Sequence, residues 1–85
     1  MNKQFSDNAW DDYLWFQKND KRSLKRANQL IKVISRTPFT GIGKPEALHG
    51  NLTGYWSRRI NQVDRIIYKV ENQTIYLAAM RGHYA

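Results

Sequence analysis

Residues 55–81 read YWSRRINQVDRIIYKVENQTIYLAAMR, and this stretch decides the class of fold. Short polar breaks divide it into three segments rich in β-branched and aromatic residues: 55–60, 65–70 and 74–81. Segments of this composition and spacing are typical of strands joined by antiparallel hairpins. Within 65–70, Ile66, Tyr68 and Val70 occupy alternate positions. We therefore expect one face of the sheet to pack on a core and the other face to carry cations.

Ahead of these strands, the sequence predicts a short edge strand at 2–5, followed by a first helix. Ser6 can act as the N-cap of this helix, and Asp7 is favourable in its first turn. Apolar and amphipathic residues then recur at helical spacing as far as position 19: Trp10, Tyr13, Leu14 and Gln17. This spacing predicts the face of the helix that packs on the core.

A second helix is predicted over 21–36, with Asp20 as its N-cap. Its expected buried stripe consists of Leu24, Ala27, Ile31 and Ile34. Other sides of the helix carry Lys21, Arg22, Lys25, Arg26, Lys32 and Arg36. These cations form either a solvated helix face or a surface that contacts phosphates. The helix should end at Thr37, because Pro38 disfavours helical backbone in the residue before it and cannot extend the hydrogen-bond ladder.

These elements predict an α+β fold in which an N-terminal short strand and a helical hairpin pack on a small twisted antiparallel sheet. No repeat, linker or low-complexity segment interrupts the chain, so residues 1–85 are expected to form a single domain. The segment 40–50 contains three glycines and a proline, which predicts a surface loop suited to functional groups. Its Gly-x-Gly-Lys-Pro run lacks the spacing of a phosphate-binding P-loop.

Composition narrows the possible functions. Fourteen Lys and Arg against seven Asp and Glu leave a net charge of +7, which favours a polyanionic partner. From position 21 to 63 there are nine basic residues and one acid, Glu46. The absence of cysteine excludes disulfides, thiol catalysis and cysteine zinc sites. Without an apolar run of about 18 residues or a signal-peptide core, no membrane association is expected, and we expect a cytoplasmic protein.

Few residues remain that could support catalysis. Two histidines without clustered acids make a poor metal site, so neither a metal nor another cofactor is expected. Glu46, Arg65 and His83 provide a carboxylate, a guanidinium and an imidazole. Attack of an RNA 2′-hydroxyl on the adjacent phosphate needs a base, an acid and a cation for the developing charge. Those three residue types can fill these roles without metal, although their spacing alone is not a fingerprint.

Five motifs run in order over essentially the full length: WDDYL at 10–14, RTPFxGxGKPExL at 36–48, LxGxWSRRI at 52–60, RxxY at 65–68 and RxHY at 81–84. Together they resemble the YoeB (Txe/YoeB) toxins of the RelE-like superfamily, which have microbial ribonuclease-like folds. The resemblance implies a toxin of a type II toxin–antitoxin system. It also implies an mRNA interferase, an endoribonuclease that enters the A site of the 70S ribosome, cuts mRNA and inhibits translation. A cognate antitoxin of the YefM/Axe kind is implied as the partner that holds it inactive.

The resemblance also assigns roles position by position. Glu46 matches the general base of the family, Arg65 the arginine that stabilises the phosphate, and His83 the general acid. Tyr84 matches an aromatic residue that helps to hold the substrate, and Arg59 resembles a further contact to the RNA. The chain departs from the family pattern at its end, where Ala85 follows the tyrosine.

Other assignments stay open at the level of sequence. Strand alternation puts Arg59 on the face of Arg65, but a change of one residue in register would present Arg58 instead. Lys44 and His49 are further candidates for substrate contact. The family often has lysine where this chain has His49, so that contact would be weaker and dependent on pH.

The aromatic residues Trp10, Trp15, Phe16 and Trp56 are expected in the core or an interface rather than stacked on bases. Trp15 lies off the main stripe and is a candidate for an antitoxin or homodimer contact. Two rival functions remain: a non-catalytic basic protein that binds RNA or the ribosome, and a DNA-binding regulator. The second is disfavoured because no segment is typical of a helix-turn-helix recognition helix.

Overall fold

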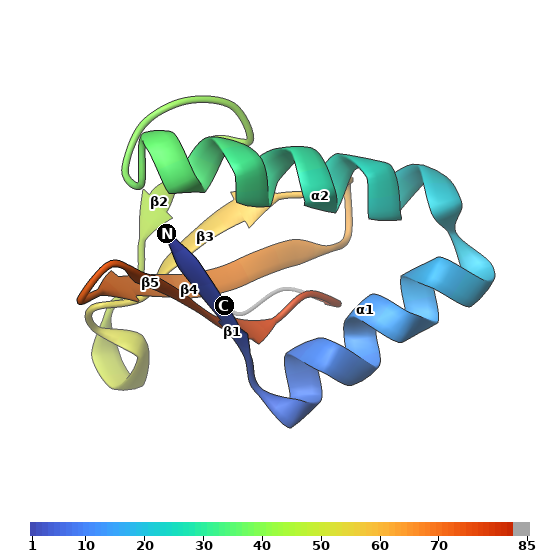
Figure 1. Cartoon of the computed structure of the whole chain (residues 1–85), viewed down its shortest axis with the longest axis horizontal. Helices are drawn as coiled ribbons and strands as arrows, with labels where there is room; N and C mark the ends of the chain where they lie inside the picture. Colours follow the sequence, from blue (N-terminus) through green and yellow to red (C-terminus); the bar gives the residue numbers. More distant parts are fainter. Residues whose placement is uncertain (83–85) are drawn as a thin grey trace.

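A computed structural model describes residues 1–82 and shows two helices packed on a five-stranded sheet (Figure 1). The strand order is β1-β5-β4-β3-β2. The elements are β1 (Asn2–Phe5), α1 (Asp7–Asn19), α2 (Lys21–Arg36), β2 (Glu46–Ala47), the 3₁₀ helix η1 (Gly50–Leu52), β3 (Trp56–Arg59), β4 (Arg65–Glu71) and β5 (Thr74–Ala79). This arrangement confirms the predicted α+β class. Neither helix within these residues is both long and apolar enough to cross a bilayer.

The start of each helix follows from local side-chain chemistry, as predicted. The Ser6 hydroxyl accepts a 3.0 Å hydrogen bond from the backbone N–H of Ala9 at the start of α1. Asp20 accepts one of 3.1 Å from the N–H of Ser23 at the start of α2. Each cap pairs a backbone donor that has no partner inside the helix.

The predicted buried face of α1 is largely wrong, although Tyr13 of that face is half-buried and packs against the core. Ala9 and Phe16 are fully buried, whereas Trp10 and Leu14 remain 47% and 40% exposed. α1 packs along β5, and there the Asp12 carboxylate accepts hydrogen bonds from two backbone N–H groups just beyond that strand. This contact favours the observed rotation of the helix about its axis. Periodicity alone could not predict that rotation, because two neighbouring apolar stripes run along α1.

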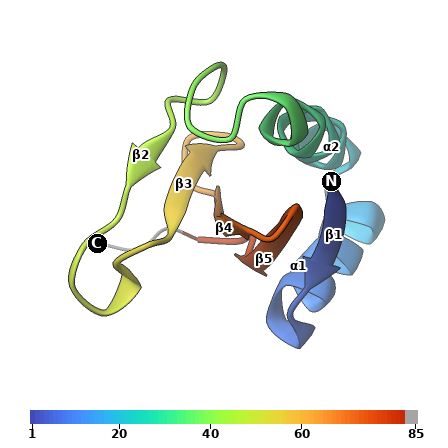
Figure 2. The ribbon, with the colours of Figure 1, turned by 60° about the vertical axis from the view of Figure 1, so that its left-hand side comes forward.

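The buried stripe of α2 is largely as predicted. Ala27, Ile31 and Ile34 are buried, Leu24 packs half-buried against the core, and Leu30 is a further core residue. They meet the alternate β4 residues Ile66 and Tyr68, both fully buried, on the covered face of the sheet. In Figure 2, α2 runs above this face while α1 lies beyond β1.

The sheet differs from the prediction in two respects. β1 pairs in parallel with β5, so the sheet is mixed rather than wholly antiparallel. Parallel strands need a long crossover between them, and α1 and α2, which follow β1, provide one. β2, which has only two residues, was not predicted as a strand and pairs antiparallel with β3.

Candidate functional site

The face of the sheet away from the helices carries three of the predicted site residues, Glu46, Arg59 and Arg65. Across the antiparallel strands, Glu46 of β2 stands opposite Ser57 of β3, which stands opposite Ile67 of β4. Arg59 stands opposite Arg65 in the next row on the same face. Directly opposed residues, and residues two apart on one strand, point to the same side of a sheet. These five side chains therefore lie on one face of the sheet, where Ser57 and Ile67 are buried.

Glu46 and Arg65 come together over β3. The carboxylate Oε2 of Glu46 lies 4.0 Å from Nη1 of Arg65. The two residues stand on β2 and β4, whose backbones are separated by about 10 Å because β3 runs between them. Both side chains must therefore reach across β3 to meet. The arrangement puts a potential proton acceptor beside a fixed cation on an open surface, where the Glu46 side chain is 67% exposed.

The alternative between Arg58 and Arg59 is settled by burial. Arg58 is fully buried on the helix side of β3, whereas Arg59 is exposed beside Arg65. The register predicted from alternation is thus the one observed. Arg59 can contact an anion on the open face, and Arg58 cannot.

Arg58 has a structural role instead. Its guanidinium donates hydrogen bonds to the carbonyl oxygens of Thr37, Thr40 and Ile42, at 2.6, 2.8 and 3.1 Å. It also donates one of 3.0 Å to the hydroxyl of Tyr68. Burial raises the pKa of Tyr68, although Arg58 acts in the opposite direction. These bonds fix the loop that leads to β2, and thereby the position of Glu46.

The loop around β2 also carries two of the predicted contact residues. Lys44 and His49 lie before and after β2, and both are exposed. Lys44 has a φ of 51°, an uncommon conformation for a residue other than glycine. Both side chains are accessible to a ligand, but neither takes part in the ion pair between Glu46 and Arg65.

Two predicted site residues, His83 and Tyr84, lie outside the described residues. The last described residue, Gly82, is held at the start of β4. Its carbonyl oxygen accepts a 3.0 Å hydrogen bond from the backbone N–H of Arg65, and its own N–H donates one of 2.7 Å to the Asp64 carboxylate. The chain therefore reaches position 82 immediately beside Arg65.

Sequence reasoning did not single out Ser57, which lies in the middle of this surface. It is 1% exposed, and its hydroxyl is the one buried side-chain polar atom without a hydrogen-bond partner in the described part of the chain. The alternation that placed Arg59 and Arg65 together also places Ser57 with them. That alternation was the one sequence signal that could have placed Ser57 beside the predicted site residues. Its burial and the lack of a hydrogen-bond partner for its hydroxyl become apparent only in the folded chain.

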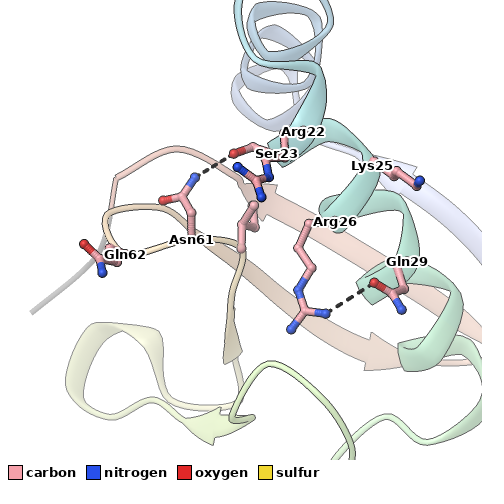
Figure 3. A pocket seen from close by; sticks show the side chains of 8 residues that line it. Arg22, Ser23, Lys25, Arg26, Gln29, Asn61 and Gln62 are labelled. Carbon is pink, nitrogen blue, oxygen red and sulfur yellow. Dashed lines mark hydrogen bonds between the residues drawn. The ribbon is translucent and has the colours of Figure 1, made fainter.

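A second cationic feature, a groove of about 500 Å³, lies between the first half of α2 and the turn after β3 (Figure 3). We call it the basic groove; its lining is Arg22, Ser23, Lys25, Arg26, Gln29, Ile60, Asn61 and Gln62. Asn61 donates a 2.8 Å hydrogen bond to Ser23, which joins the two walls. Within residues 1–82, acids form ion pairs with Arg65 and Lys69 but with no cation of this groove. Its charge is therefore available to an external anion.

Across the part of the chain that the structure describes, no three His, Cys, Asp or Glu side chains gather as a metal-ion site. The chemistry on offer is that of a carboxylate, a hydroxyl and guanidinium groups on a small sheet.

Two helices packed on a five-stranded sheet are the fold of RelE-like toxins, which the structural neighbours of this chain share. Residues 5–84 match the family described as the YoeB-like toxin of bacterial type II toxin–antitoxin systems. The chain belongs to this family. The YoeB toxin of Synechocystis sp. is 54% identical over 84 residues, with 99% of this chain and 98% of the relative covered.

Solved structures agree with this membership. A YoeB/ParE toxin from Agrobacterium tumefaciens is 42% identical and superposes with a TM-score of 0.97, covering 99% of this chain and 100% of that one. YoeB of Staphylococcus aureus is 48% identical, with 99% and 98% covered. It has been solved in a heterotetrameric YoeB–YefM toxin–antitoxin complex, with a TM-score of 0.91, and as a dimer, with a TM-score of 0.93.

Proposed function

We propose that this toxin is a ribosome-dependent endoribonuclease that cuts mRNA in the A site by metal-free transesterification. The observation that carries the proposal is the approach of Glu46 to Arg65, at 4.0 Å, on an open cationic face of the sheet. A carboxylate beside a guanidinium supplies both a base for a hydroxyl and a positive charge for a phosphate. Membership in the YoeB-like toxin family supports the same reaction class.

In the proposed reaction, the Glu46 carboxylate takes the proton of the RNA 2′-hydroxyl, and the 2′-oxygen attacks the adjacent phosphorus. Arg65 neutralises the charge that develops on the non-bridging oxygens. His83 protonates the 5′-oxygen as its bond to phosphorus breaks, so the upstream fragment ends in a 2′,3′-cyclic phosphate. His83 directly follows Gly82, whose carbonyl oxygen accepts a hydrogen bond from the backbone N–H of Arg65. That connection supports a shared site for the base, the cation and the acid.

Arg59 and Tyr84 are proposed to hold the substrate, with Lys44 and His49 as contacts at the rim. Arg59 stands directly opposite Arg65 in the sheet. Glu46 is the one acid that pairs with either of these two arginines among the described residues, so their positive charges still repel one another. A polyanion lying across them relieves that repulsion. An RNA backbone supplies such a row of charges.

The basic groove is the proposed surface for ribosomal RNA. Its three cations form no ion pair within 4.0 Å among the described residues, and they lie on α2 rather than on the catalytic face. Phosphate contacts of this kind position a protein without reading sequence. Two separate cationic surfaces would let the toxin bind ribosome and message at once, which accounts for a requirement for the ribosome.

A cognate antitoxin is the proposed inhibitor, as the YoeB–YefM complexes of Staphylococcus aureus suggest. An acidic antitoxin segment laid over Glu46, Arg59 and Arg65 would neutralise the arginines and exclude RNA. The exposed aromatic side chain of Trp15, which stacks 3.7 Å from the Arg81 guanidinium, is a candidate contact for the antitoxin or a second copy of the toxin.

Primer extension on mRNA, with and without 70S ribosomes, tests the proposal. Wild-type protein should cut within A-site codons only when ribosomes are present. Glu46→Gln and His83→Gln should each reduce cleavage by about 10²–10⁴-fold, the usual contribution of a general acid or base. Glu71→Gln, which removes a carboxylate that pairs with Lys69 on the same strand as Arg65, is the matched control and should cut normally.

The alternative, a non-catalytic protein that binds RNA or the ribosome, makes a different prediction. This alternative also explains the basic groove and the net charge, but it gives Glu46 and His83 no catalytic role. Tight binding of wild-type protein to ribosomes without any chain scission would establish it and exclude the nuclease.

A further inference from the structure

The Ser57 hydroxyl is an unexplained feature of the catalytic face. Ser57 is 1% exposed, and its Oγ has no hydrogen-bond partner within residues 1–82. A buried hydroxyl without a partner loses its bonds to water and gains nothing in return. Alanine would avoid this cost with the loss of a single atom. The hydroxyl is therefore expected to gain its partner when something binds.

The position of Ser57 shows where that partner must lie. Ser57 stands directly opposite Glu46 on one side and Ile67 on the other, so its Cβ is about 5 Å from that of Glu46. The contact between Glu46 and Arg65 spans β3 on this same face. Ser57 thus forms the floor of the site, beneath the two groups that are proposed to act on the scissile phosphate.

The contact above Ser57 can open to admit an anion. Its 4.0 Å separation exceeds the 2.7–3.2 Å of a hydrogen bond between nitrogen and oxygen. An ion pair this exposed contributes little to stability. A phosphate that enters between the two side chains would meet Arg65 from one side and the Ser57 hydroxyl from below.

Glu46 itself is the nearest rival partner for the hydroxyl. The carboxylate stands directly opposite Ser57, yet neither of its oxygens accepts a hydrogen bond from Oγ. Instead the Glu46 side chain reaches past Ser57 toward Arg65. The donor is therefore left for a ligand on the floor of the site.

We propose that Ser57 is a substrate-binding residue whose hydroxyl donates a hydrogen bond to a non-bridging oxygen of the scissile phosphate. This inference rests on the proposed nuclease function. It adds a neutral donor to the charged groups, at the oxygens where negative charge increases as the 2′-oxygen attacks. No proton is transferred by Ser57 in this role.

The test compares Ser57→Ala with wild type in ribosome-dependent cleavage of mRNA, together with thermal unfolding. Loss of a hydrogen bond to a charged phosphate should lower kcat/KM by about 10- to 100-fold. The unfolding temperature should stay the same or rise, because the substitution removes a buried group without a partner. Ser35→Ala, which removes a hydroxyl bonded to the Ile31 carbonyl of α2, is the control and should leave kcat/KM unchanged.

If the wild-type protein cuts mRNA, the proposed function stands, and three results for Ser57→Ala would then overturn the inference about Ser57. These are a kcat/KM within about twofold of wild type, a loss of activity that parallels a loss of folding, and a shift of the acidic limb of the pH–rate profile. The last would show that Ser57 acts on the proton affinity of Glu46 rather than on the phosphate. If wild-type protein fails to cut at all, the proposed function itself fails.

Discussion

The Nε of Arg58 donates a buried 3.0 Å hydrogen bond to the Tyr68 hydroxyl, which itself donates one of 2.7 Å to the carbonyl of Pro38. This chain of bonds joins β3, β4 and the loop that follows α2. The other guanidinium nitrogens of Arg58 bind carbonyls of the same loop. The buried Arg58 guanidinium therefore holds the segment that places Glu46 on the face of the sheet away from the helices.

Replacement of Arg58 should destabilise the protein. Arg58→Ala removes four hydrogen bonds and leaves several backbone carbonyls without a partner, which should cost about 3 kcal/mol or more. For a domain of this size, that loss lowers the unfolding temperature by roughly 10–20 °C. Arg59→Ala is the matched control, since Arg59 is exposed, and should change stability by no more than about 0.5 kcal/mol. Equal unfolding temperatures for the two variants would contradict the structural role of Arg58.

Gly43 should not tolerate a side chain. Its φ is +86°, and an added Cβ would lie 2.7 Å from Cδ2 of Leu30 on α2. Gly54 has a similar φ of +95° but open space around it, so Gly54→Ala measures the backbone strain alone, about 1–2 kcal/mol. Gly43→Ala should cost a further 1–3 kcal/mol or so for overpacking. Chemical denaturation of the two variants gives the difference, and equal stabilities would show that α2 moves away without cost.

The rotation of α1 can be tested by a pair of truncations. Phe16 is fully buried, whereas Leu14 is 40% exposed on the same helix. Phe16→Ala should lower the free energy of unfolding by about 3–5 kcal/mol, but Leu14→Ala by roughly 0.5 kcal/mol. Denaturant unfolding of both variants measures this contrast. The reverse order would restore the face that helical periodicity predicted.

Charge reversal in the basic groove should weaken ribosome binding. The double variant Lys25→Glu, Arg26→Glu should lose phosphate contacts to ribosomal RNA. Each lost contact should lower the slope of log Kd against the logarithm of the salt concentration by about 1. Lys3→Glu, a charge reversal on β1 away from the groove, should change that slope little. Binding to purified 70S ribosomes over a series of salt concentrations provides the measurement. An unchanged slope in the double variant would make these cations a solvated helix face.

Asp20 should make stability depend on pH in the acid range. The side-chain hydrogen bond from Ser23, and then the backbone N–H of Ser23, hold the pKa of Asp20 below its usual 3.8. Because the unfolded chain binds this proton more readily, the contribution of Asp20 to stability is complete above pH 3.8. It is lost as the pH falls through the lower value of the folded state.

Asp20→Asn keeps a capping oxygen but cannot titrate. The unfolding temperatures of wild type and this variant should therefore converge as the pH is lowered below 3.8. Ser23→Ala, which removes the strongest donor to the carboxylate, should also show a shallower acid dependence than wild type. Parallel curves for wild type and Asp20→Asn would mean that the cap acts without its charge.

The sequence by itself determined the features that depend on neighbours along the chain. Ser6 and Asp20 cap helices through bonds to residues three positions away, so their roles could be predicted from local spacing. The alternation around Ile66 likewise predicted which side of the sheet is buried and placed Arg59 with Arg65. The motifs that resemble the YoeB toxins predicted the family in the same way, because they lie in order along the chain.

Only the tertiary structure decided the features that depend on distant contacts. β2 has no strand signal of its own, and it forms where Arg58 anchors the preceding loop beside β3. The approach of Glu46 to Arg65, the burial of Ser57 and the rotation of α1 all arise from elements that meet across the fold. Local propensity cannot specify them, because the energy that fixes each one comes from hydrogen bonds and packing between residues far apart in sequence.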